Sequence, residues 1–361
     1  MGKKILISGN EAIGYGAIYS GCTHYFGYPI TPQNEVIEFF AREFPRIGRT
    51  FVQADSEVSS INMVCGAAAA GVRVMTSTAS TAFSLMQEGL SAIAAMEVPC
   101  VVANVQRGGP GAGSTQHAQM DYFLATRGSH GDYCNIVLAP FSVQETFTLT
   151  QLAFHLADKH RHPVLMLTDG IMGQMKEGVD LKTLDLEPLP PKDWAATGSA
   201  ERNLKRNFLH NSPGILGFLT GDTYKSNMER YYDKYRKMQE TEVRYQLKDM
   251  EDAEVIVIAY GSTARVASRA QYEARRESLK VGMIRPITLW PFPGEIIRKY
   301  AEKARSVIVV EDSMGQMLED VRCAVMERAE VHFVGFMDRH LPTSSGMILP
   351  EAVTAKIKAV I

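Results

Sequence analysis

The sequence of 361 residues predicts two α/β domains, each built on a doubly wound parallel sheet. Strand-like segments that are apolar along their whole length alternate with helix-like segments up to about residue 187. Such strands are typical of parallel sheets with helices on both faces. A proline-rich break at residues 186–192 ends this alternation, and a second one starts at residue 253. We therefore expect domains at residues 1–187 and 251–361, joined by a linker with a charged helix at residues 188–250.

The elements of the first domain follow from apolar runs and from residues that favour helix ends. Asn10 is expected to cap the first helix. Asp55 and Ser56 are N-cap residues for an alanine-rich helix that begins around Glu57 and ends near Gly71. Strands are predicted at residues 4–8, 24–28, 50–53, 72–76, 100–105 and 164–168, and further helices at residues 34–44, 83–96 and 142–159.

The second half repeats this alternation after an irregular segment. Residues 193–222 are polar and without a regular pattern, whereas residues 224–250 are dense in charge. The charged stretch predicts an exposed amphipathic helix that bridges the two domains. Strands are predicted at residues 254–259, 281–285 and 307–310, and helices at residues 262–277, from the turn at 286–293 to residue 303, and at 316–328.

Charge and composition exclude several classes of protein. The 38 basic and 40 acidic residues leave a net charge of −2, so nucleic acid is not expected as a main partner. No apolar run is long enough to span a bilayer, and the N-terminal apolar run is too short for a signal peptide. We therefore expect a soluble cytoplasmic protein that does not associate with membranes.

The five cysteines are scattered and never spaced as Cys-x-x-Cys. This spacing argues against a disulfide framework, a structural zinc site or an iron–sulfur cluster held by this chain alone. Each cysteine is expected to be a small buried hydrophobic residue. The histidines show no metal-binding pattern either, so no metal site is expected on this chain. The residues concerned are Cys22, Cys65, Cys100, Cys134 and Cys323, and His117, His130, His155, His160 and His162.

Glu57 is the first candidate for a functional side chain. It lies in the first turn of a predicted helix at the end of a predicted strand, and ligands of open α/β sheets bind at that end of the strands. The alternative is that the helix macrodipole alone favours an acidic residue there.

Two further candidates also follow predicted strands. In Tyr28-Pro-Ile-Thr-Pro32 the prolines limit the movement of Thr31, whose hydroxyl can face the same cleft as Glu57; the alternative is a rigid turn with Thr31 near a helix cap. Arg107 precedes a glycine-rich run, where a guanidinium is suited to hold a carboxylate bidentately. The alternative for Arg107 is a solvated arginine on a surface loop.

Two other segments carry polar groups at strand ends. The hydroxyl-rich run from Thr76 to Thr81 either bonds a polar ligand ring or caps the following helix, and the cap is favoured for any one residue. Asp169-Gly170 resembles the start of a Mg²⁺–diphosphate motif, but no paired asparagine follows. We therefore interpret it as a strand-to-turn signal.

Four motifs of the first domain are found together: Tyr28-Pro-Ile-Thr-Pro32, Asp55-Ser-Glu57, Ser84-Leu-Met-Gln-Glu88 and Gln106-Arg-Gly-Gly-Pro110. With them the chain resembles the α subunit of 2-oxoacid:ferredoxin oxidoreductases, most closely the 3-methyl-2-oxobutanoate (branched-chain 2-oxoacid) type. The second half, with its Gly-Ser-Thr turn at 261–263, Pro-Phe-Pro at 291–293 and Gly315-Gln316, resembles the transketolase C-terminal-like domain of the same subunit.

The resemblance implies an enzyme that decarboxylates a 2-oxoacid, transfers the acyl group to coenzyme A and sends two electrons to ferredoxin. This chain would supply the thiamine-diphosphate pyrimidine-binding domain. A β subunit with the diphosphate-binding motif would share the cofactor and hold Mg²⁺. A γ subunit and a ferredoxin-like δ subunit would complete the complex, with [4Fe-4S] clusters on the partner subunits and an external ferredoxin as acceptor.

The resemblance also implies roles for individual residues. Glu57 would be catalytic, because a carboxyl group that is hydrogen-bonded to a nitrogen of the aminopyrimidine ring promotes the tautomer that makes thiamine reactive. Thr31 and Arg107 would bind the substrate carboxylate. Further contacts to the cofactor would come from Tyr28, Pro29, Thr81 and Met86.

Three alternatives remain open at this stage. Pyruvate or 2-oxoglutarate can replace the branched-chain substrate, because Ser80-Thr-Ala82 and Gly111-Ala112 stand where many relatives have Gly-Pro-Gly and Ser-Thr. A transketolase- or sulfopyruvate-decarboxylase-like subunit would lack electron transfer. A non-catalytic assembly module would keep the fold without the chemistry.

Overall fold

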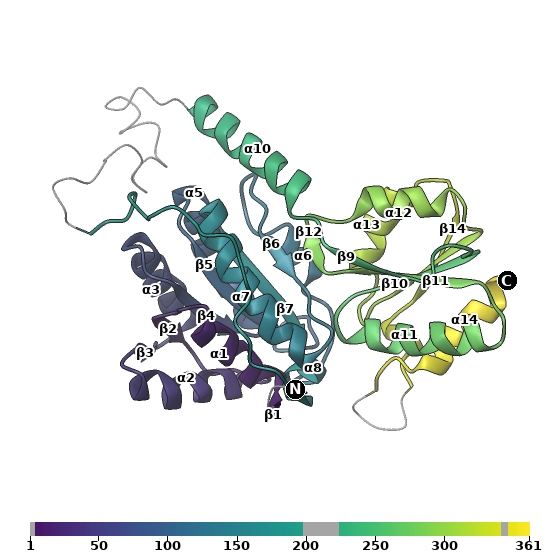
Figure 1. Ribbon diagram of the computed structural model, residues 1–361, viewed down its shortest axis with the longest axis horizontal. Helices are drawn as coiled ribbons and strands as arrows, with labels where there is room; N and C mark the ends of the chain where they lie inside the picture. The colour runs from purple at the N-terminus through teal and green to yellow at the C-terminus, as the bar shows by residue number, and fades with distance from the viewer. Residues whose placement is uncertain (1–3, 198–223, 341–345) are drawn as a thin grey trace.

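The structure is a computed structural model that describes residues 4–197, 224–340 and 346–361. Two mainly parallel sheets lie side by side, each with helices on both faces, and α10 (Tyr224–Thr241) extends from the junction along the first of them (Figure 1). Two further strands, β1 (Ile5–Ser8) and β8 (Lys176–Val179), pair separately.

The first sheet has seven strands in the order β12-β6-β7-β5-β4-β2-β3, all parallel to their neighbours except β12. Adjacent side chains of β5 enter different cores: Val101 packs with α1, α2 and α7, whereas Val102 packs with α3 and α5. Because successive side chains of a strand point to opposite faces, helices cover both faces, and the predicted doubly wound domain is confirmed. The strands are β2 (His24–Gly27), β3 (Thr50–Gln53), β4 (Val74–Thr78), β5 (Cys100–Gln106), β6 (Ile136–Leu138), β7 (Pro163–Asp169) and β12 (Thr288–Trp290), and the helices are α1 (Gly9–Tyr19), α2 (Asn34–Arg46), α3 (Glu57–Ala69), α4 (Ser80–Leu85), α5 (Gln87–Met96), α6 (Tyr122–Thr126), α7 (Val143–His160) and α8 (Gly170–Gln174).

The second sheet has five strands in the order β14-β13-β10-β11-β9, with only β9 antiparallel to its neighbour. Val257 of β10 packs with α11 and α14, whereas Ile256 and Ile258 face α12 and α13. The second domain is therefore also covered on both faces. Its elements are β9 (Tyr245–Lys248), β10 (Val255–Ala259), α11 (Gly261–Arg276), β11 (Val281–Pro286), α12 (Gly294–Ala301), β13 (Ser306–Val310), α13 (Gln316–Val325), β14 (Glu330–Val334) and α14 (Pro350–Val360).

The start of the chain differs from the prediction. Strand β1 lies outside the first sheet and pairs antiparallel with β8. The cap of α1 is Ser8 and not Asn10, because Ser8 and Glu11 form a reciprocal capping box. Asn10 lies inside the helix, and its amide donates to the Pro32 carbonyl and to Glu35.

The predicted helix at 83–96 is two helices, α4 and α5, and the charged helix from residue 224 ends at Thr241. Strand β9 follows within the range 188–250 and joins the second sheet. Conversely, β12 comes from the predicted 286–293 turn and pairs with β6 of the first sheet. The two sheets therefore each use a strand from beyond the predicted boundaries. No element was predicted at β14 or α14.

Three remaining expectations concern the linker, the membrane and the cysteines. Residues 181–192 have no regular structure, while most of the polar stretch at 193–222 lies outside the described residues. None of the helices in the described ranges is both long and apolar enough to cross a membrane. Cys22 and Cys100 are buried, but Cys323 is exposed on α13, so the expectation of burial is wrong there.

Candidate active site

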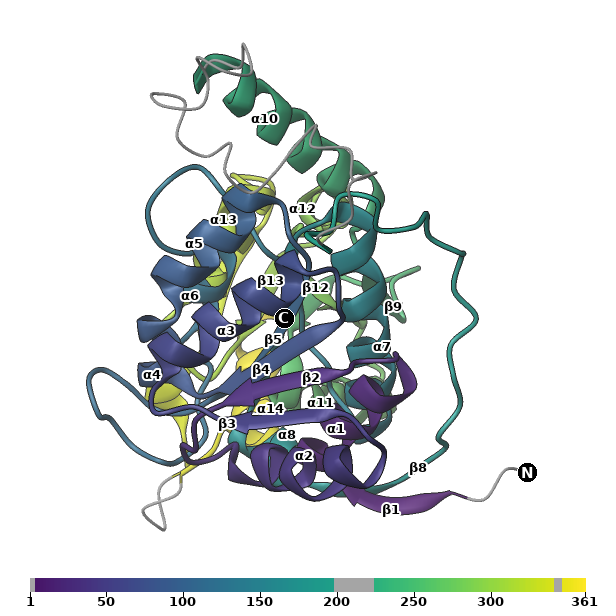
Figure 2. The same cartoon turned by 90° about the vertical axis from the view of Figure 1, so that its left-hand side faces the viewer.

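Four neighbouring strands, β5, β4, β2 and β3, end at one edge of the first sheet, and the predicted site residues follow these ends. Figure 2 shows the strands side by side, with α2 on one side of the sheet and α3 on the other. Glu57 comes after β3, Thr31 after β2, Thr81 after β4 and Arg107 directly after β5. Because ligands of open α/β sheets bind outside this edge, the topology places all four residues on the ligand-binding side.

Glu57 is a buried carboxylate without a partner. It is the first residue of α3, and Ser56 caps the helix by accepting a hydrogen bond from the Ser59 N–H at 3.1 Å. Glu57 is only 6% exposed, yet among the described residues its carboxylate has no hydrogen bond or ion pair. The macrodipole favours an acidic residue at this position but does not require its burial. Burying an unpaired carboxylate is costly, so Glu57 is suited to receive a donor from a ligand.

Arg107 is a buried cation held only by carbonyl oxygens. Its Nη1 donates to the Thr31 carbonyl at 2.9 Å and its Nη2 to the Ala112 carbonyl at 3.1 Å. The residue is 9% exposed, its Nε has no partner, and it forms no ion pair within the described residues. The alternative of a solvated surface arginine is therefore wrong. A guanidinium in this state is suited to bind a carboxylate.

The contact between Arg107 and Thr31 brings two of the predicted residues together. The Thr31 side chain is exposed, and its Oγ1 accepts a 3.4 Å hydrogen bond from Asn34. Thr31 does not cap α2, whose N-cap residue is Gln33. In the same way, the hydroxyl-rich run does not cap α4, because the cap residue is Ala79 and makes no side-chain bond. The preference for capping by the hydroxyl-rich run is therefore wrong, whereas the alternative of a rigid turn with Thr31 near a helix cap stays open, because Thr31 lies two residues before Gln33.

The remaining predicted residues, Tyr28, Pro29, Thr81 and Met86, form no side-chain hydrogen bond to Glu57 or Arg107 in the described part of the chain. Tyr28 and Thr81 are half-buried and Pro29 is exposed. Met86 is fully buried between α4 and α5, where it belongs to the core that contains α3. The roles of all these residues in binding stay predictions.

A buried polar cluster near Arg107, formed by Ser80, Asn104, Gln106 and Asp121, was not predicted from the sequence. Asp121 accepts hydrogen bonds from the Ser80 hydroxyl at 2.6 Å and from Asn104 at 2.9 Å, and its own N–H donates to Gln106 at 3.1 Å. Asn104 and Gln106 stand inside the apolar strand β5, which was the available signal. Asp121 and Ser80 gave no local signal, because only the fold brings them together.

Burial raises the pKa of Asp121, although the hydrogen bonds from Ser80 and Asn104 and the charge of Arg107 act in the opposite direction. The cluster therefore contains a carboxylate whose negative charge interacts electrostatically with the buried Arg107.

The loop that follows Arg107 is closed on itself. The Gly108 N–H donates to the Gln116 carbonyl and the Ser114 N–H to the Gly108 carbonyl, both at 2.9 Å. Gly113 has a φ of +57°, and a Cβ there would lie 1.9 Å from the Gly108 oxygen. Glycine is therefore required for this closure. The closed loop supplies the Ala112 carbonyl that holds Arg107.

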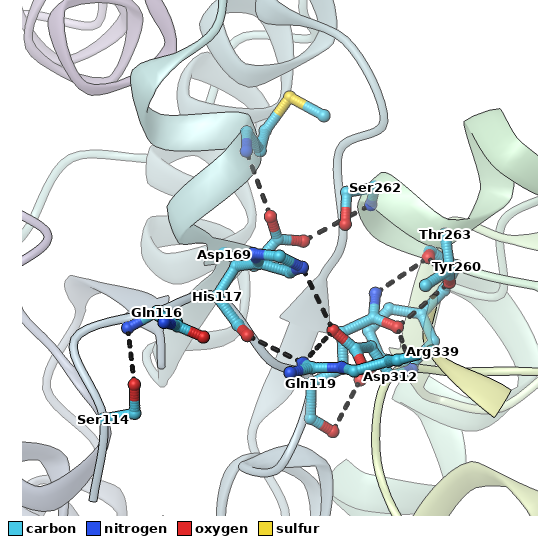
Figure 3. Close-up of polar contacts among 11 residues, drawn as sticks. Ser114, Gln116, His117, Gln119, Asp169, Tyr260, Ser262, Thr263, Asp312 and Arg339 are labelled. Atoms are coloured by element: carbon cyan, nitrogen blue, oxygen red, sulfur yellow. Dashed lines mark hydrogen bonds and ion pairs between the residues drawn. The ribbon is translucent and has the colours of Figure 1, made fainter. Parts of the chain in front are cut away.

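The end of this loop is held by the second domain (Figure 3). The Gln119 amide donates to the Tyr260 carbonyl at 3.0 Å and accepts from the Asp312 N–H at 2.9 Å and from the Thr263 hydroxyl at 3.0 Å. The Gln119 N–H donates to the Asp312 carbonyl at 2.7 Å. Tyr260 and Asp312 follow β10 and β13, so the carboxyl edge of the second sheet meets the loop of the first.

Charged groups surround the same junction. Arg339 pairs with both oxygens of Asp312 and donates to the His117 carbonyl at 2.9 Å. His117 Nε2 lies 3.4 Å from Asp312, and burial lowers the pKa of His117 despite the nearby carboxylates. Asp169, read from the sequence as a strand-to-turn signal, ends β7 and caps α8 by accepting from the Met172 N–H. Its pKa is raised by burial.

The fold defines an α/β protein with a ligand-binding sheet edge, and comparison with known families assigns it to a thiamine diphosphate-binding class. Residues 15–246 match the family of pyruvate flavodoxin/ferredoxin oxidoreductases, thiamine diphosphate-binding. Residues 253–345 match core domain II of pyruvate:ferredoxin oxidoreductase. The chain belongs to the 2-oxoacid:ferredoxin oxidoreductase family, and the resemblance predicted from its motifs is confirmed.

Similar proteins cover most of the chain. It is 47% identical over 320 residues to the ketoisovalerate oxidoreductase subunit VorB of Methanothermobacter marburgensis, covering 88% of this chain and 89% of the relative. It is 35% identical over 351 residues to the 2-oxoglutarate synthase subunit KorA of Methanocaldococcus jannaschii, covering 92% and 94%. Such relatives are subunits of multi-subunit enzymes.

Solved structures support the same fold. The 2-oxoglutarate:ferredoxin oxidoreductase from Magnetococcus marinus, with 2-oxoglutarate, coenzyme A and succinyl-CoA bound, matches with a TM-score of 0.84 and 29% identity. The match covers 99% of this chain and 65% of that one, so this chain spans less than two thirds of the length of that protein. A split gene transketolase matches with a TM-score of 0.61 at 16% identity, which concerns the fold alone.

Proposed function

We propose that this chain is the α subunit of a thiamine-diphosphate-dependent oxidoreductase that converts 3-methyl-2-oxobutanoate and coenzyme A to the acyl-CoA and CO2. Two electrons pass to ferredoxin through iron–sulfur clusters on partner subunits. The 47% identity to a ketoisovalerate oxidoreductase subunit supports this substrate over 2-oxoglutarate, for which the relative cited above is 35% identical. The observation that carries the proposal is that one sheet edge holds both a buried carboxylate, Glu57, and a buried guanidinium, Arg107, and that neither has a charged partner within the described ranges.

The residues present fit the aminopyrimidine ring of thiamine. When bound, the cofactor supplies a nucleophilic carbon that attacks the 2-oxo group of the substrate. A Glu57 carboxyl oxygen would share a proton with a ring nitrogen, which gives the unpartnered carboxylate its missing hydrogen bond. Burial of Glu57 strengthens this bond because water does not compete for it.

Arg107 and Thr31 would orient the substrate. The guanidinium would bind the carboxylate of the 2-oxoacid, and the exposed Thr31 hydroxyl would donate to the same group. The Thr31 and Ala112 carbonyls hold the guanidinium in place before the substrate arrives, so little reorganisation is needed. The carboxylate leaves as CO2, so its position relative to the reacting carbon decides the reaction.

The surface beside Glu57 supports a partner subunit. Val58 and Met63 of α3 and Leu85 of α4 are exposed apolar side chains on the two helices that follow β3 and β4. Exposed apolar side chains are a feature of protein interfaces. We assign this surface to a β subunit that holds the diphosphate and Mg²⁺, with γ and ferredoxin-like δ subunits elsewhere in the complex.

Substitution of Glu57 tests the proposal. In the complete complex, Glu57→Gln is expected to lower 2-oxoacid-dependent, coenzyme-A-dependent viologen reduction about 100-fold or more, because glutamine cannot share the proton. Glu295→Gln is the matched control: it is exposed and also lies in the first turn of a helix, α12, so it tests the macrodipole alone. Near wild-type activity of Glu57→Gln would show that this residue does not have the proposed catalytic role.

Analysis of the purified complex separates the rival functions. A β chain with bound thiamine diphosphate and an iron-rich ferredoxin-like chain support the proposal. A thiamine-binding partner without iron indicates a decarboxylase or transketolase-like enzyme, and the absence of thiamine indicates an assembly module. The ratio of activities with 3-methyl-2-oxobutanoate, pyruvate and 2-oxoglutarate then identifies the substrate.

A further inference from the structure

The buried Asp121 is tied to the main chain of Arg107 through a single hydroxyl. Asp121 is 8% exposed, and its Oδ2 accepts from the Ser80 hydroxyl at 2.6 Å. The Arg107 N–H donates to the same Ser80 oxygen at 2.8 Å. Ser80 is itself fixed, because its N–H donates to the Asn104 side chain at 2.9 Å. The position of the Arg107 main chain is therefore set by a fully bonded buried cluster.

The same carboxylate acts on Arg107 through its charge. The Arg107 guanidinium has no ion pair within the described part of the chain, and its direct partners are two neutral carbonyl groups. The charges of Arg107 and Asp121 interact through a buried region, where electrostatic interactions are poorly screened. Asp121 therefore weakens the positive potential that Arg107 presents to a ligand without contacting the guanidinium.

Resting on the proposed role of Arg107, we propose that Asp121 is a positioning residue that sets how tightly Arg107 binds the carboxylate of the 2-oxoacid. Through Ser80 it holds the Arg107 main chain, which favours binding. Through its charge it offsets part of the Arg107 charge, which limits binding. The site then holds the substrate carboxylate firmly enough to orient it while the substrate still exchanges.

Two substitutions separate these contributions. Asp121→Asn removes the charge, while the asparagine oxygen still accepts from both Ser80 and Asn104. Ser80→Ala keeps the charge and removes the link between Asp121 and Arg107. A residue that only supports the fold would give the same sign of change in both variants, whereas the proposal requires opposite signs.

The test uses steady-state kinetics of the complete complex with a viologen acceptor. The 2-oxoacid concentration is varied at saturating coenzyme A, and the coenzyme A concentration is then varied at saturating 2-oxoacid. Asp121→Asn is expected to lower the KM for the 2-oxoacid about threefold to tenfold, with kcat and the KM for coenzyme A within about twofold of wild type. Ser80→Ala is expected to raise the KM for the 2-oxoacid by a similar factor. An unchanged or raised 2-oxoacid KM in Asp121→Asn overturns the proposal.

Asp169→Asn is the matched control, because Asp169 is also a buried aspartate, at the end of β7, and accepts from the Met172 and Ser262 N–H groups and not from Ser80 or Asn104. Its 2-oxoacid KM is expected to stay within about twofold of wild type; a decrease equal to that of Asp121→Asn overturns the assignment to Asp121. If the Asp121→Asn complex does not assemble, Ser80→Ala decides the matter, and an unchanged KM there overturns the proposal.

Arg107→Met distinguishes this inference from the proposed function. A raised 2-oxoacid KM in Arg107→Met together with no decrease in Asp121→Asn overturns only the role of Asp121. An unchanged KM in Arg107→Met overturns the substrate-binding role of Arg107 and the inference with it. In the Arg107→Met background, Asp121→Asn is expected to have no further effect on the 2-oxoacid KM, since the charge it offsets is gone.

Discussion

Arg107 shows how one residue combines a fixed position with an unsatisfied charge. Two of its donors bond carbonyl oxygens, its Nε has no partner among the described residues, and the residue is buried. The proposed binding role needs an arginine here, because its planar fork can hold both carbonyls and still present donors to a carboxylate. Lysine carries the same charge on a single nitrogen and cannot do both.

Arg107→Lys is therefore expected to raise the KM for the 2-oxoacid about tenfold or more, although the net charge is unchanged. The measurement is the dependence of viologen reduction by the complete complex on 2-oxoacid concentration, with the KM for coenzyme A as internal control. A 2-oxoacid KM within twofold of wild type would show that charge alone suffices.

At the scale of the element, a buried glutamate outside α13 accepts hydrogen bonds from the N-terminus of that helix. Glu311 follows β13, is fully buried, and accepts from the Met317 N–H at 2.9 Å and the Leu318 N–H at 3.1 Å. Burial raises the pKa of Glu311 from 4.5 to about 7, although these two bonds act in the opposite direction. The folded chain therefore holds a proton on Glu311 at pH values where the unfolded chain has lost it.

This proton makes stability depend on pH. Between about pH 4.5 and 7 the folded state binds more protons at Glu311 than the unfolded state, so the contribution of this group falls as pH rises and stays lost above pH 7. In Glu311→Gln this decline is expected to disappear. Thermal unfolding midpoints of the wild-type and variant complexes at pH values from 5 to 8 measure this decline. If the midpoints of both complexes change with pH in the same way, the pH dependence does not come from Glu311.

The order of the elements could be predicted because their strands are apolar along their whole length. The prediction did not extend to the partners of short strands. Strand β12 has three residues and lies between prolines, so its pattern resembles a turn, and only tertiary contacts with β6 make it a strand. The antiparallel pairing of β1 with β8 joins segments about 170 residues apart and leaves no local signal.

The grouping of the candidate site residues at one sheet edge could be predicted in part for the same reason; their roles stay predictions. Glu57, Thr31 and Arg107 each follow a strand, and in a parallel sheet the strand ends meet at one edge. Asp121 and Gln119 lie in an irregular segment, and their contacts depend on groups that the fold brings from α4, from β5 and from the second domain. A single sequence carries no local pattern for such contacts.

At the scale of the whole molecule, Gln119 links the loop that follows Arg107 to the second domain. Its side chain is fully bonded to Tyr260, Thr263 and Asp312. Gln119→Leu leaves the Asp312 N–H without this acceptor, which costs about 1–3 kcal/mol of the free energy of unfolding. Because the same residue ends the loop after Arg107, the KM for the 2-oxoacid is also expected to rise.

A second buried glutamine provides the control for this prediction. Gln271 on α11 is fully buried and bonds only within the second domain, to Asp249 and to the Val281 carbonyl. Gln271→Leu is expected to lower the thermal midpoint of the complex as Gln119→Leu does, but to leave the 2-oxoacid KM within twofold. Equal KM values for the two variants would show that the junction affects stability only.

The strand that crosses between the sheets has a consequence for chimaeras of related subunits. β12 belongs to the second half of the chain, yet it pairs with β6 through Thr288 and Leu138, and the Ile287 carbonyl accepts from the Ala139 N–H at 2.8 Å. A hybrid that takes its two halves from different parents therefore has to inherit residues 136–139 and 287–290 from the same parent. Otherwise β12 of one parent must pair with β6 of another parent, with which it did not co-evolve.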